Sequence, residues 1–208
     1  MSTRTSLCAL VAVAGMTSAA SADIFTSAGG IIINDSGPAT PYGTGNAAIT
    51  VAGMTGATAV TVTLSEVIHT FPDDFAALLV APNGANVLLF SGAGGSTGGS
   101  WTWTFDDLAG AMLPTSGALS SGTFLPGADD WFNDLPAPAP AGPYGTSLAA
   151  TLGGGGPDGV WQLFVVDFNS GDDGIIAGWS LNFTVPTPGA AALLGLGGIV
   201  GLRRRRAN

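Results

Sequence analysis

The sequence predicts an all-β domain, an antiparallel β-sandwich, and three features lead to this prediction. Short apolar segments alternate with turns rich in Gly, Pro and Asp, and no stretch has the spacing of a long amphipathic helix. The chain of 208 residues contains 33 Gly and 13 Pro, which disfavours long helices. Between two end segments described below, residues 23–184 suit one domain with a single core.

The first half of this domain is expected to contain six short strands. The clearest is 58–70, where Val60, Val62 and Leu64 alternate with hydroxyl residues. Because continued alternation would bury Glu66, we expect a bulge near Ser65 to Val67. The other five are residues 31–33, 47–51, 75–80, 87–90 and 101–105.

Two of these strands are expected to form a hairpin. Residues 75–80 are wholly apolar, Ala81-Pro82-Asn83-Gly84 has turn chemistry, and residues 87–90 return from it. Residues 91–100 are Gly-rich and predict a loop. Residues 108–144 contain six of the 13 prolines and predict an irregular region.

The second half is expected to contribute three strands. Residues 147–152 predict a weak strand, and residues 160–168 are apolar on both faces, as in a strand that is covered on both sides. In residues 175–185, Trp179, Leu181 and Phe183 alternate with polar residues. We therefore expect a strand with one face in the core and the other exposed to solvent. Many short strands with such turns favour a sandwich.

Residues 1–22 have the composition of a secretory signal peptide. Arg4 precedes the apolar residues 7–16, and Ala20-Ser21-Ala22 before Asp23 is a small-residue cleavage site. The only cysteine, Cys8, lies in this segment, so the mature chain has no disulfide. We therefore expect an N-terminal signal helix that signal peptidase removes, and export of the remainder.

Residues 185–208 combine three features in order: Val185-Pro186-Thr187-Pro188, the apolar residues 189–202, and Arg203, Arg204, Arg205 and Arg206. As a helix the apolar stretch would be roughly 21 Å long, shorter than the ~30 Å hydrocarbon core of a bilayer. Tilt, bilayer thinning and arginine snorkelling would permit insertion, with the arginines on the cytoplasmic side. The tail therefore predicts a short hydrophobic helix that anchors the chain transiently in the inner membrane.

This tail resembles the PEP-CTERM sorting signal of Gram-negative bacteria that carry an exosortase. Val185, Pro186, Pro188 and the four arginines match that family's motif, and Thr187 stands where the family has Glu. The resemblance implies recognition by an exosortase, cleavage near Pro188, and release to the cell envelope, the cell surface or the medium.

The charges of the chain are strongly segregated. All five basic residues lie in the two end segments, whereas all 14 acidic residues lie between Asp23 and Asp173. The domain is therefore a polyanion that should repel nucleic acid and anionic membrane surfaces. Thirteen of the acids are Asp, a residue that serves both as a calcium ligand and as a turn former.

Four segments between residues 47 and 184 share an order and a spacing with a known domain. They are His69-Thr70 with Asp73-Asp74-Phe75 and residues 79–84; residues 105–109; residues 122–126; and residues 159–167 with Gly174 and residues 178–181. Together they resemble the P domain, or Homo B domain, of subtilisin-like proprotein convertases. The resemblance implies a jelly-roll that stabilises a preceding catalytic domain, but residues 23–46 are too few to hold such a domain, so we do not expect protease activity.

The inventory of reactive side chains also disfavours an enzyme. His69 is the only histidine, and the Gly-x-Ser-x-Gly stretch Gly94-Gly95-Ser96-Thr97-Gly98 lies in the Gly-rich predicted loop rather than between a strand and a helix. We therefore expect His69 to be hydrogen-bonded at a strand end near the core. There is no His or Cys cluster for zinc or iron. Four Asp-Asp doublets leave a carboxylate pair for glycoside hydrolysis as an open alternative.

Calcium is the sharper chemical hypothesis. Asp73, Asp74, Asp106, Asp107 and Asp167 adjoin strand ends in the segments that resemble the P domain, so the fold is expected to gather them at one rim as hard oxygen ligands. The loop Asp129-Asp130-Trp131-Phe132-Asn133-Asp134 is a second candidate. The alternative is that these aspartates only form turns and face water.

The tryptophans raise the possibility of a carbohydrate-binding face. Trp101 and Trp103 share one strand face and are expected in the core, whereas Trp131 lies among aspartates and is the candidate for glycan contact. The sequence thus favours an exported, exosortase-sorted, non-catalytic structural or interaction domain. The alternatives are a module that binds extracellular polysaccharide and a P domain that stabilises a separately encoded subtilisin-like protease; an envelope protein is a further possible partner.

Overall fold

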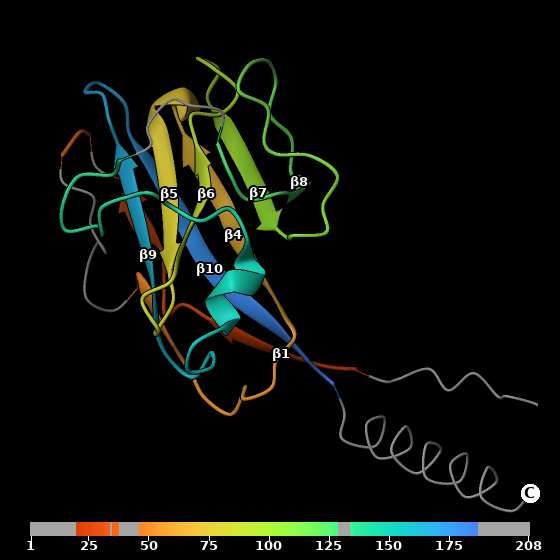
Figure 1. The fold of residues 1–208 in the computed structure, drawn as a ribbon. Coiled ribbons are helices and arrows are strands. Elements are labelled where there is room, and N and C mark those ends of the chain that lie inside the picture. Colours follow the sequence, from red (N-terminus) through yellow and green to blue (C-terminus); the bar gives the residue numbers. More distant parts are fainter. Residues whose placement is uncertain (1–19, 34, 38–45, 129–133, 187–208) are drawn as a thin grey trace, which may run out of the picture. The chain divides into compact units, whose positions relative to one another are not determined.

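The computed structural model describes residues 20–33, 35–37, 46–128 and 134–186, and Ser21–Val185 forms one unit (Figure 1). The predicted signal helix up to residue 19, the C-terminal hydrophobic helix and residues 129–133 lie outside the described residues. Within the ranges just given, no helix is long and apolar enough to cross a membrane.

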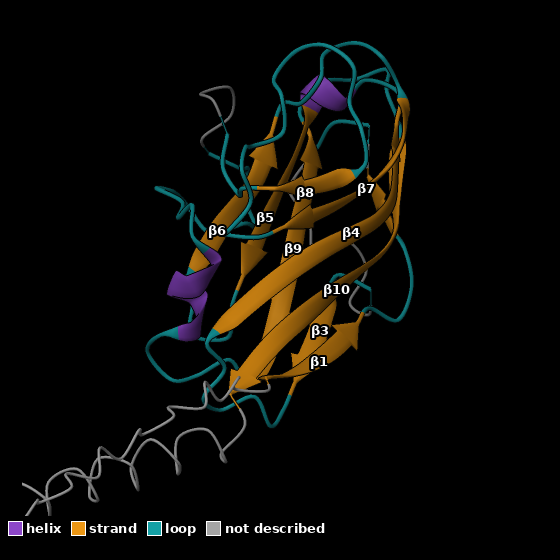
Figure 2. Cartoon of the chain, turned by 90° about the vertical axis from the view of Figure 1, so that its right-hand side faces the viewer, coloured by secondary structure: helices purple, strands orange, loops and turns teal. Residues whose placement is uncertain are grey.

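Two β-sheets pack face to face, which confirms the predicted all-β sandwich. Sheet A has the strand order β1-β10-β4-β7-β8, with β2 also paired to β10, and sheet B has the order β3-β9-β5-β6. In Figure 2, β4 and β10 of sheet A cross obliquely in front of β9 of sheet B. The strands are β1 (Ala20–Thr26), β2 (Ile31–Ile33), β3 (Ala48–Val51), β4 (Ala59–His69), β5 (Phe75–Val80), β6 (Asn86–Ser91), β7 (Gly99–Phe105), β8 (Gly122–Phe124), β9 (Gly159–Asp167) and β10 (Gly174–Pro186).

The ladders β10–β4, β4–β7, β5–β6, β5–β9 and β3–β9 are antiparallel, as predicted, but β8 pairs parallel with β7. Residues 106–121 make the long connection that a parallel pair requires. The hairpin of β5 and β6 confirms the turn prediction, since Gly84 N–H donates to the Ala81 carbonyl (2.9 Å).

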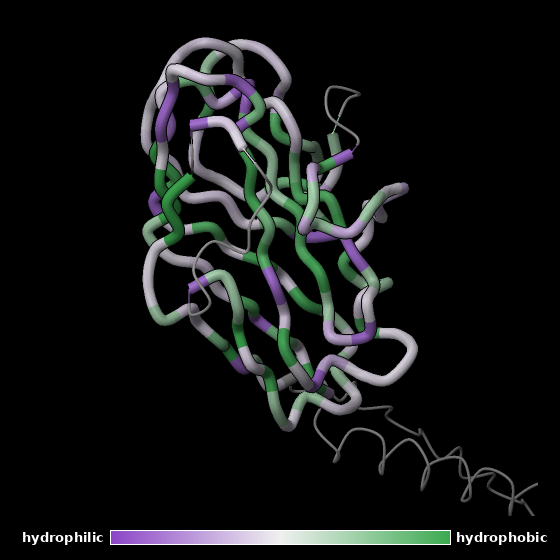
Figure 3. Tube along the Cα trace, turned by 90° about the vertical axis from the view of Figure 1, so that its left-hand side faces the viewer, coloured by the Kyte–Doolittle hydropathy of each residue, from purple (hydrophilic) through white to green (hydrophobic). Residues whose placement is uncertain are grey.

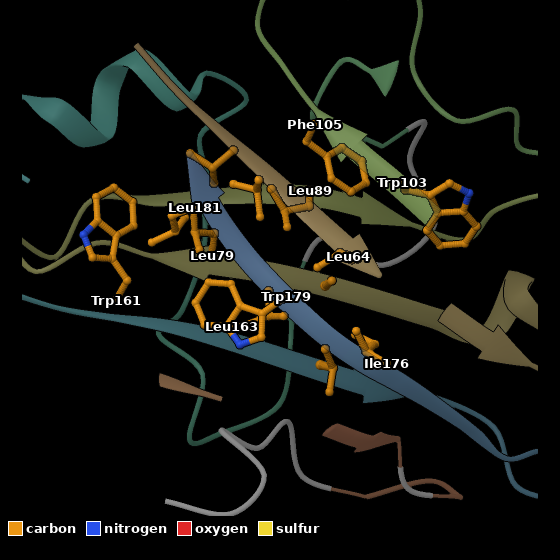
Figure 4. Close-up of a cluster of buried hydrophobic side chains, with 14 of the residues drawn as sticks. Leu64, Leu79, Leu89, Trp103, Phe105, Trp161, Leu163, Ile176, Trp179 and Leu181 are labelled. Carbon is orange, nitrogen blue, oxygen red and sulfur yellow. The ribbon is translucent and has the colours of Figure 1, made fainter. Parts of the chain in front are cut away.

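The core between the sheets is built from the alternating apolar residues that the sequence indicated. Figure 4 shows Leu64, Trp103, Trp179 and Leu181 of sheet A meeting residues of sheet B such as Leu163, all fully or almost fully buried. A second apolar cluster covers the outer face of sheet B, where Leu135 and other residues pack against β5, β6 and β9. This confirms that residues 163–167 of the expected strand are covered on both faces, whereas Val160 near its start is 50% exposed. Hydrophobic residues follow the strands in Figure 3, and hydrophilic ones gather in the loops.

The expected bulge lies at Glu66. The register between β4 and β7 shifts between Leu64 and Val67, and Glu66 takes a left-handed backbone with φ of 47°. Its N–H donates to Thr102 Oγ1 (3.2 Å) and its side chain is exposed. One extra residue therefore keeps Val67 in the core and the carboxylate in water.

Three local predictions differ from the structure. Residues 147–152 form no strand: Leu148–Leu152 is a short 3-10 helix, η2, because Asp107 accepts hydrogen bonds at its start. Strands β1 and β8 are not among the predicted strands; both lie at the edges of sheet A, where β1 pairs with β10 and β8 with β7. β1 also begins at Ala20, so the last residues of the predicted signal peptide lie in the first strand.

Candidate functional site

One end of the sandwich gathers six aspartates, which we call the acidic end. There β4 ends at His69, the 3-10 helix η1 (Pro72–Asp74) leads into β5, β9 ends at Asp167, and β10 begins at Gly174. The registers His69↔Gly174 and Phe75↔Asp167 bring these strand ends together. The six residues are Asp35, Asp73, Asp74, Asp167, Asp172 and Asp173.

A buried pair, His69 and Asp167, forms the centre of the acidic end. His69 Nε2 lies 3.3 Å from Asp167 Oδ2, and each residue is only 1% exposed. The Phe75 ring stacks on the imidazole, with centroids 5.3 Å apart. A Cβ at Gly174 would overlap the imidazole and the Ile68 carbonyl, so only glycine fits there. His69 thus sits at a strand end near the core, as predicted.

Hydrogen bonding assigns the tautomer of His69. The N–H of Phe71 donates to Nδ1 (3.1 Å), so the proton of the neutral ring resides on Nε2, facing Asp167. Burial lowers the pKa of the His69 imidazole from its usual 6.5, and the carboxylates of Asp172, Asp74 and Asp173 oppose that change. The ring is therefore neutral near pH 7.

The carboxyl group of Asp167 has a strongly raised pKa. Burial raises the pKa of its carboxyl from 3.8 to about 6; the Asn169 N–H, which donates to Oδ1 (2.9 Å), opposes this rise, and repulsion from Asp74, Asp172 and Asp35 adds to it. Oδ2 makes no hydrogen bond and lies 3.3 Å from His69 Nε2. The part of the chain that the structure describes contains no Lys or Arg to neutralise it.

Three of the surrounding carboxylates accept hydrogen bonds from neighbouring loop residues. Asn169 Nδ2 donates to Asp74 Oδ1 (2.6 Å), Thr70 Oγ1 donates to Asp172 Oδ1 (2.8 Å), and Gly171 N–H donates to Asp35 Oδ1 (2.6 Å). Burial, with repulsion from Asp74, raises the pKa of Asp73. Among the described residues, no three His, Cys, Asp or Glu side chains converge as a preformed metal site.

The structure separates the five aspartates that were expected at one rim. Asp73, Asp74 and Asp167 belong to the acidic end. Since His69 pairs with Gly99 while Val62 pairs with Phe105, Asp106 and Asp107 lie at the other end of sheet A. Asp107 accepts bonds from Ser147 Oγ (2.8 Å), Leu148 N–H (2.8 Å) and Ala149 N–H (2.9 Å), and Asp106 Oδ1 accepts one from Leu108 N–H (2.9 Å). These two serve as turn and cap acceptors.

Sequence reasoning missed Asp35, Asp172 and Asp173 as members of the acidic end. The sequence carries only a weak signal for their proximity, because it is the pairing of β10 with β2 and β4 that brings these loops together. Of the sorting motif, Val185 and Pro186 are the last two residues of β10; Pro188 and the four arginines lie outside the described residues.

The described tryptophans do not form a glycan platform. Trp101 and Trp103 are 8% and 0% exposed and stack at 5.4 Å, which confirms them as core residues. Their indole N–H groups donate to the carbonyls of Leu119 and Ser120, both at 3.2 Å. Trp161 and Trp179 are also buried, and Trp131 lies outside the described residues.

A row of exposed isoleucines crosses three strands near the acidic end. Ile175 of β10 pairs with Ile32 of β2 and with Ile68 of β4, and these residues are 36%, 65% and 46% exposed. We call Ile32, Ile175 and Ile68 the isoleucine row.

Comparisons with known proteins give one distant likeness. No protein-family model and no curated protein sequence matches the chain. Among solved structures, the chain is similar to the serine protease of Aeromonas sobria, determined in complex with its chaperone, at 17% sequence identity and a TM-score of 0.35. The match covers 79% of this chain and 27% of the protease chain, so this chain spans about a quarter of the protease's length.

Proposed function

We propose that this protein is an exported, non-catalytic structural or interaction domain of the P-domain type, a jelly-roll that is sorted to the cell surface through its C-terminal tail. The main support for a non-catalytic role is the burial of the His69–Asp167 pair. A general base must reach its substrate. Here the only histidine is enclosed by Phe75, Gly174 and Asp167, so its function is structural.

Turnover assays test the absence of catalysis. The purified protein, incubated with fluorescent casein, nitrophenyl esters and nitrophenyl glycosides, is expected to give rates equal to buffer. Turnover that is lost in His69→Gln and kept in Thr50→Val, a control at an exposed position of β3, would contradict the proposal.

Fractionation of cells tests the sorting. The wild-type chain is expected in the envelope or surface fraction after signal peptidase and exosortase processing. Replacing Arg203, Arg204, Arg205 and Arg206 by serine should move it to the medium, because the tail then loses its cytoplasmic anchor. An unchanged distribution of this variant would refute exosortase-type sorting; Thr50→Val is again the control.

Docking on a separately encoded protease or an envelope protein is a second candidate, and the isoleucine row favours it. Apolar side chains that cluster on a surface commonly mark protein contacts. Co-purification of a protease with the wild-type chain, lost in Ile32→Ser with Ile175→Ser, would support this role.

Calcium binding is proposed for the acidic end alone. The support is the buried Asp167 Oδ2, which accepts no hydrogen bond; burial and repulsion from Asp74, Asp172 and Asp35 raise the pKa of this carboxyl. A hard divalent cation would offset this repulsion, which the described part of the chain cannot neutralise with its own side chains. Asp106 and Asp107 are not part of this proposed site.

A further inference from the structure

Beyond the isoleucine row, the outer face of sheet A is covered by neutral polar side chains. Buried apolar residues alternate along β4, β7 and β10 with half-buried polar ones that point away from the core. We call this surface the hydroxyl face: Thr61, Thr63, Ser65, Thr102, Thr104, Thr123, Ser180 and Thr184, with Asn182, whose amide oxygen is buried.

The strand registers make this face an ordered array. Ser180 pairs with Thr63, Thr63 with Thr104, and Thr104 with Thr123, so four hydroxyls form one row across β10, β4, β7 and β8. Thr63 Oγ1 and Thr104 Oγ1 are 2.9 Å apart and hydrogen-bonded. Neighbours repeat at about 4.8 Å across strands and about 6.8 Å along them.

The hydroxyl face is nearly free of charge. The four strands that form it contain one carboxylate, Glu66, which projects from the bulge near one border. The whole chain nevertheless has a formal charge of −9 at pH 7. A partner on this face therefore gains nothing from charge, and an acidic partner is repelled by the remainder of the domain.

We propose that the hydroxyl face binds neutral polysaccharide; this inference rests on the non-catalytic interaction role proposed above and deepens it. Each threonine presents a methyl group and a hydroxyl that donates and accepts, which matches the C–H and O–H groups of a sugar ring. The β-branched side chains are stiff at χ1, so little side-chain freedom is lost on binding.

Sheet geometry favours a polymer chain over a crystalline surface such as ice. Adjacent strands rotate by about 20–25°, so the row from Ser180 to Thr123 turns by roughly 60–75° over three steps. A sugar polymer with rotatable linkages follows such a twist, whereas a flat lattice plane does not.

Affinity electrophoresis of the intact protein in gels with dextran, starch or galactomannan tests the proposal, with alginate as an acidic comparison. Retardation is expected in at least one neutral gel and not in alginate. In Thr63→Val with Thr104→Val, which keeps shape and β-branching, the dissociation constant should rise at least about fivefold, since each lost hydrogen bond contributes modestly. Thr50→Val, at an exposed threonine of sheet B, should bind like the wild type.

Each other outcome overturns the assignment. Migration unaffected by every neutral polysaccharide would refute carbohydrate binding, and retardation that survives both valines would place the sugar elsewhere, with the segment around Trp131 the first alternative. Retardation only in alginate would refute the charge argument, and inhibition of ice growth without any retardation would identify ordered water as the ligand. Envelope retention of the chain, measured by fractionation, does not depend on these results, so the two proposals fail separately.

Discussion

Asp167 is a carboxylate that the fold keeps from water and from any cationic side chain in the described part of the chain. The His69 ring lies 3.3 Å from its Oδ2, and that ring is itself held neutral by burial. The pair is therefore a polar contact inside an apolar setting rather than a strong ion pair. Such a contact costs stability whenever the carboxyl ionises.

This arrangement predicts a pH dependence of stability. A carboxyl whose folded-state pKa is about 6 against an ordinary 3.8 stabilises the fold below pH 4, and this contribution is lost as the pH rises through 6. The loss at pH 7 is roughly 3 kcal/mol, at about 1.4 kcal/mol for each pKa unit. Asp167→Asn removes the carboxyl, so this pH-dependent loss of stability is absent from the variant.

Urea unfolding at pH 4, 5, 6 and 7 measures the effect. Relative to wild type, Asp167→Asn should gain stability steadily from pH 4 to pH 7, whatever its constant packing cost. The His69 contribution is present in both chains. Asp23→Asn, at an exposed position, serves as the control and should show no such gain. A difference that stays flat with pH would show that Asp167 titrates normally.

Glu66 gives a second prediction at single-residue scale. A non-glycine residue at φ of 47° costs about 1–2 kcal/mol, whereas glycine adopts this backbone freely. Glu66→Gly should therefore be about 1 kcal/mol more stable than Glu66→Ala in denaturant unfolding. At Thr61, an extended position of the same strand, the order should reverse, with alanine the more stable. The same order at both positions would argue against the bulge.

Among the secondary-structure elements, η2 depends on a distant side chain. Asp107 follows β7, yet it receives the N–H groups of Leu148 and Ala149 and the hydroxyl of Ser147. Asp107→Ala should cost about 1–2 kcal/mol, the usual effect of losing a helix cap, and Asp106→Ala less, because Asp106 accepts a single bond. Thermal unfolding of the two variants compares them directly. Equal losses would mean that the cap bonds do not set the stability of η2.

Elements with strong alternation were predictable from the sequence, and elements that depend on remote partners were not. Val60, Val62 and Leu64 define their strand by themselves, and Glu66 forces the bulge because a carboxylate is costly in a core. By contrast, residues 148–152 contain only Leu, Ala and Thr, whose local pattern does not distinguish a strand from a 3-10 turn. The deciding contact comes from Asp107, and the edge strands β1 and β8 are likewise defined by their partners.

The candidate site was predictable only in part for the same reason. The sequence placed His69 near the core and Asp73, Asp74 and Asp167 at strand ends. It did not show which strand ends share a rim, because that depends on registers such as His69↔Gly174 and Val62↔Phe105. The expected single rim is therefore divided between the two ends of the sandwich.

On the scale of the whole molecule, this division makes the calcium proposal specific. Saturation at ~100 times the dissociation constant adds about 2.7 kcal/mol, or roughly 5–10 °C in the unfolding midpoint of a domain of this size. Melting in millimolar calcium and in chelator should show such a shift for wild type and for Asp106→Asn, and no shift for Asp74→Asn. If wild type melts at the same temperature in both buffers, the aspartates of the acidic end only form turns.

The position of β10 within sheet A has a mechanical consequence. β10 is flanked by β1 and β2 on one side and by β4 on the other, and its ladder with β4 runs from Gly174 to Thr184. A force applied at Pro186 along the strand loads these hydrogen bonds in shear, all at once, whereas an edge strand that is peeled away breaks them one by one. A sandwich tethered through this strand therefore resists flow or traction far better than one held by β8, and single-molecule pulling from the two positions should give clearly different rupture forces.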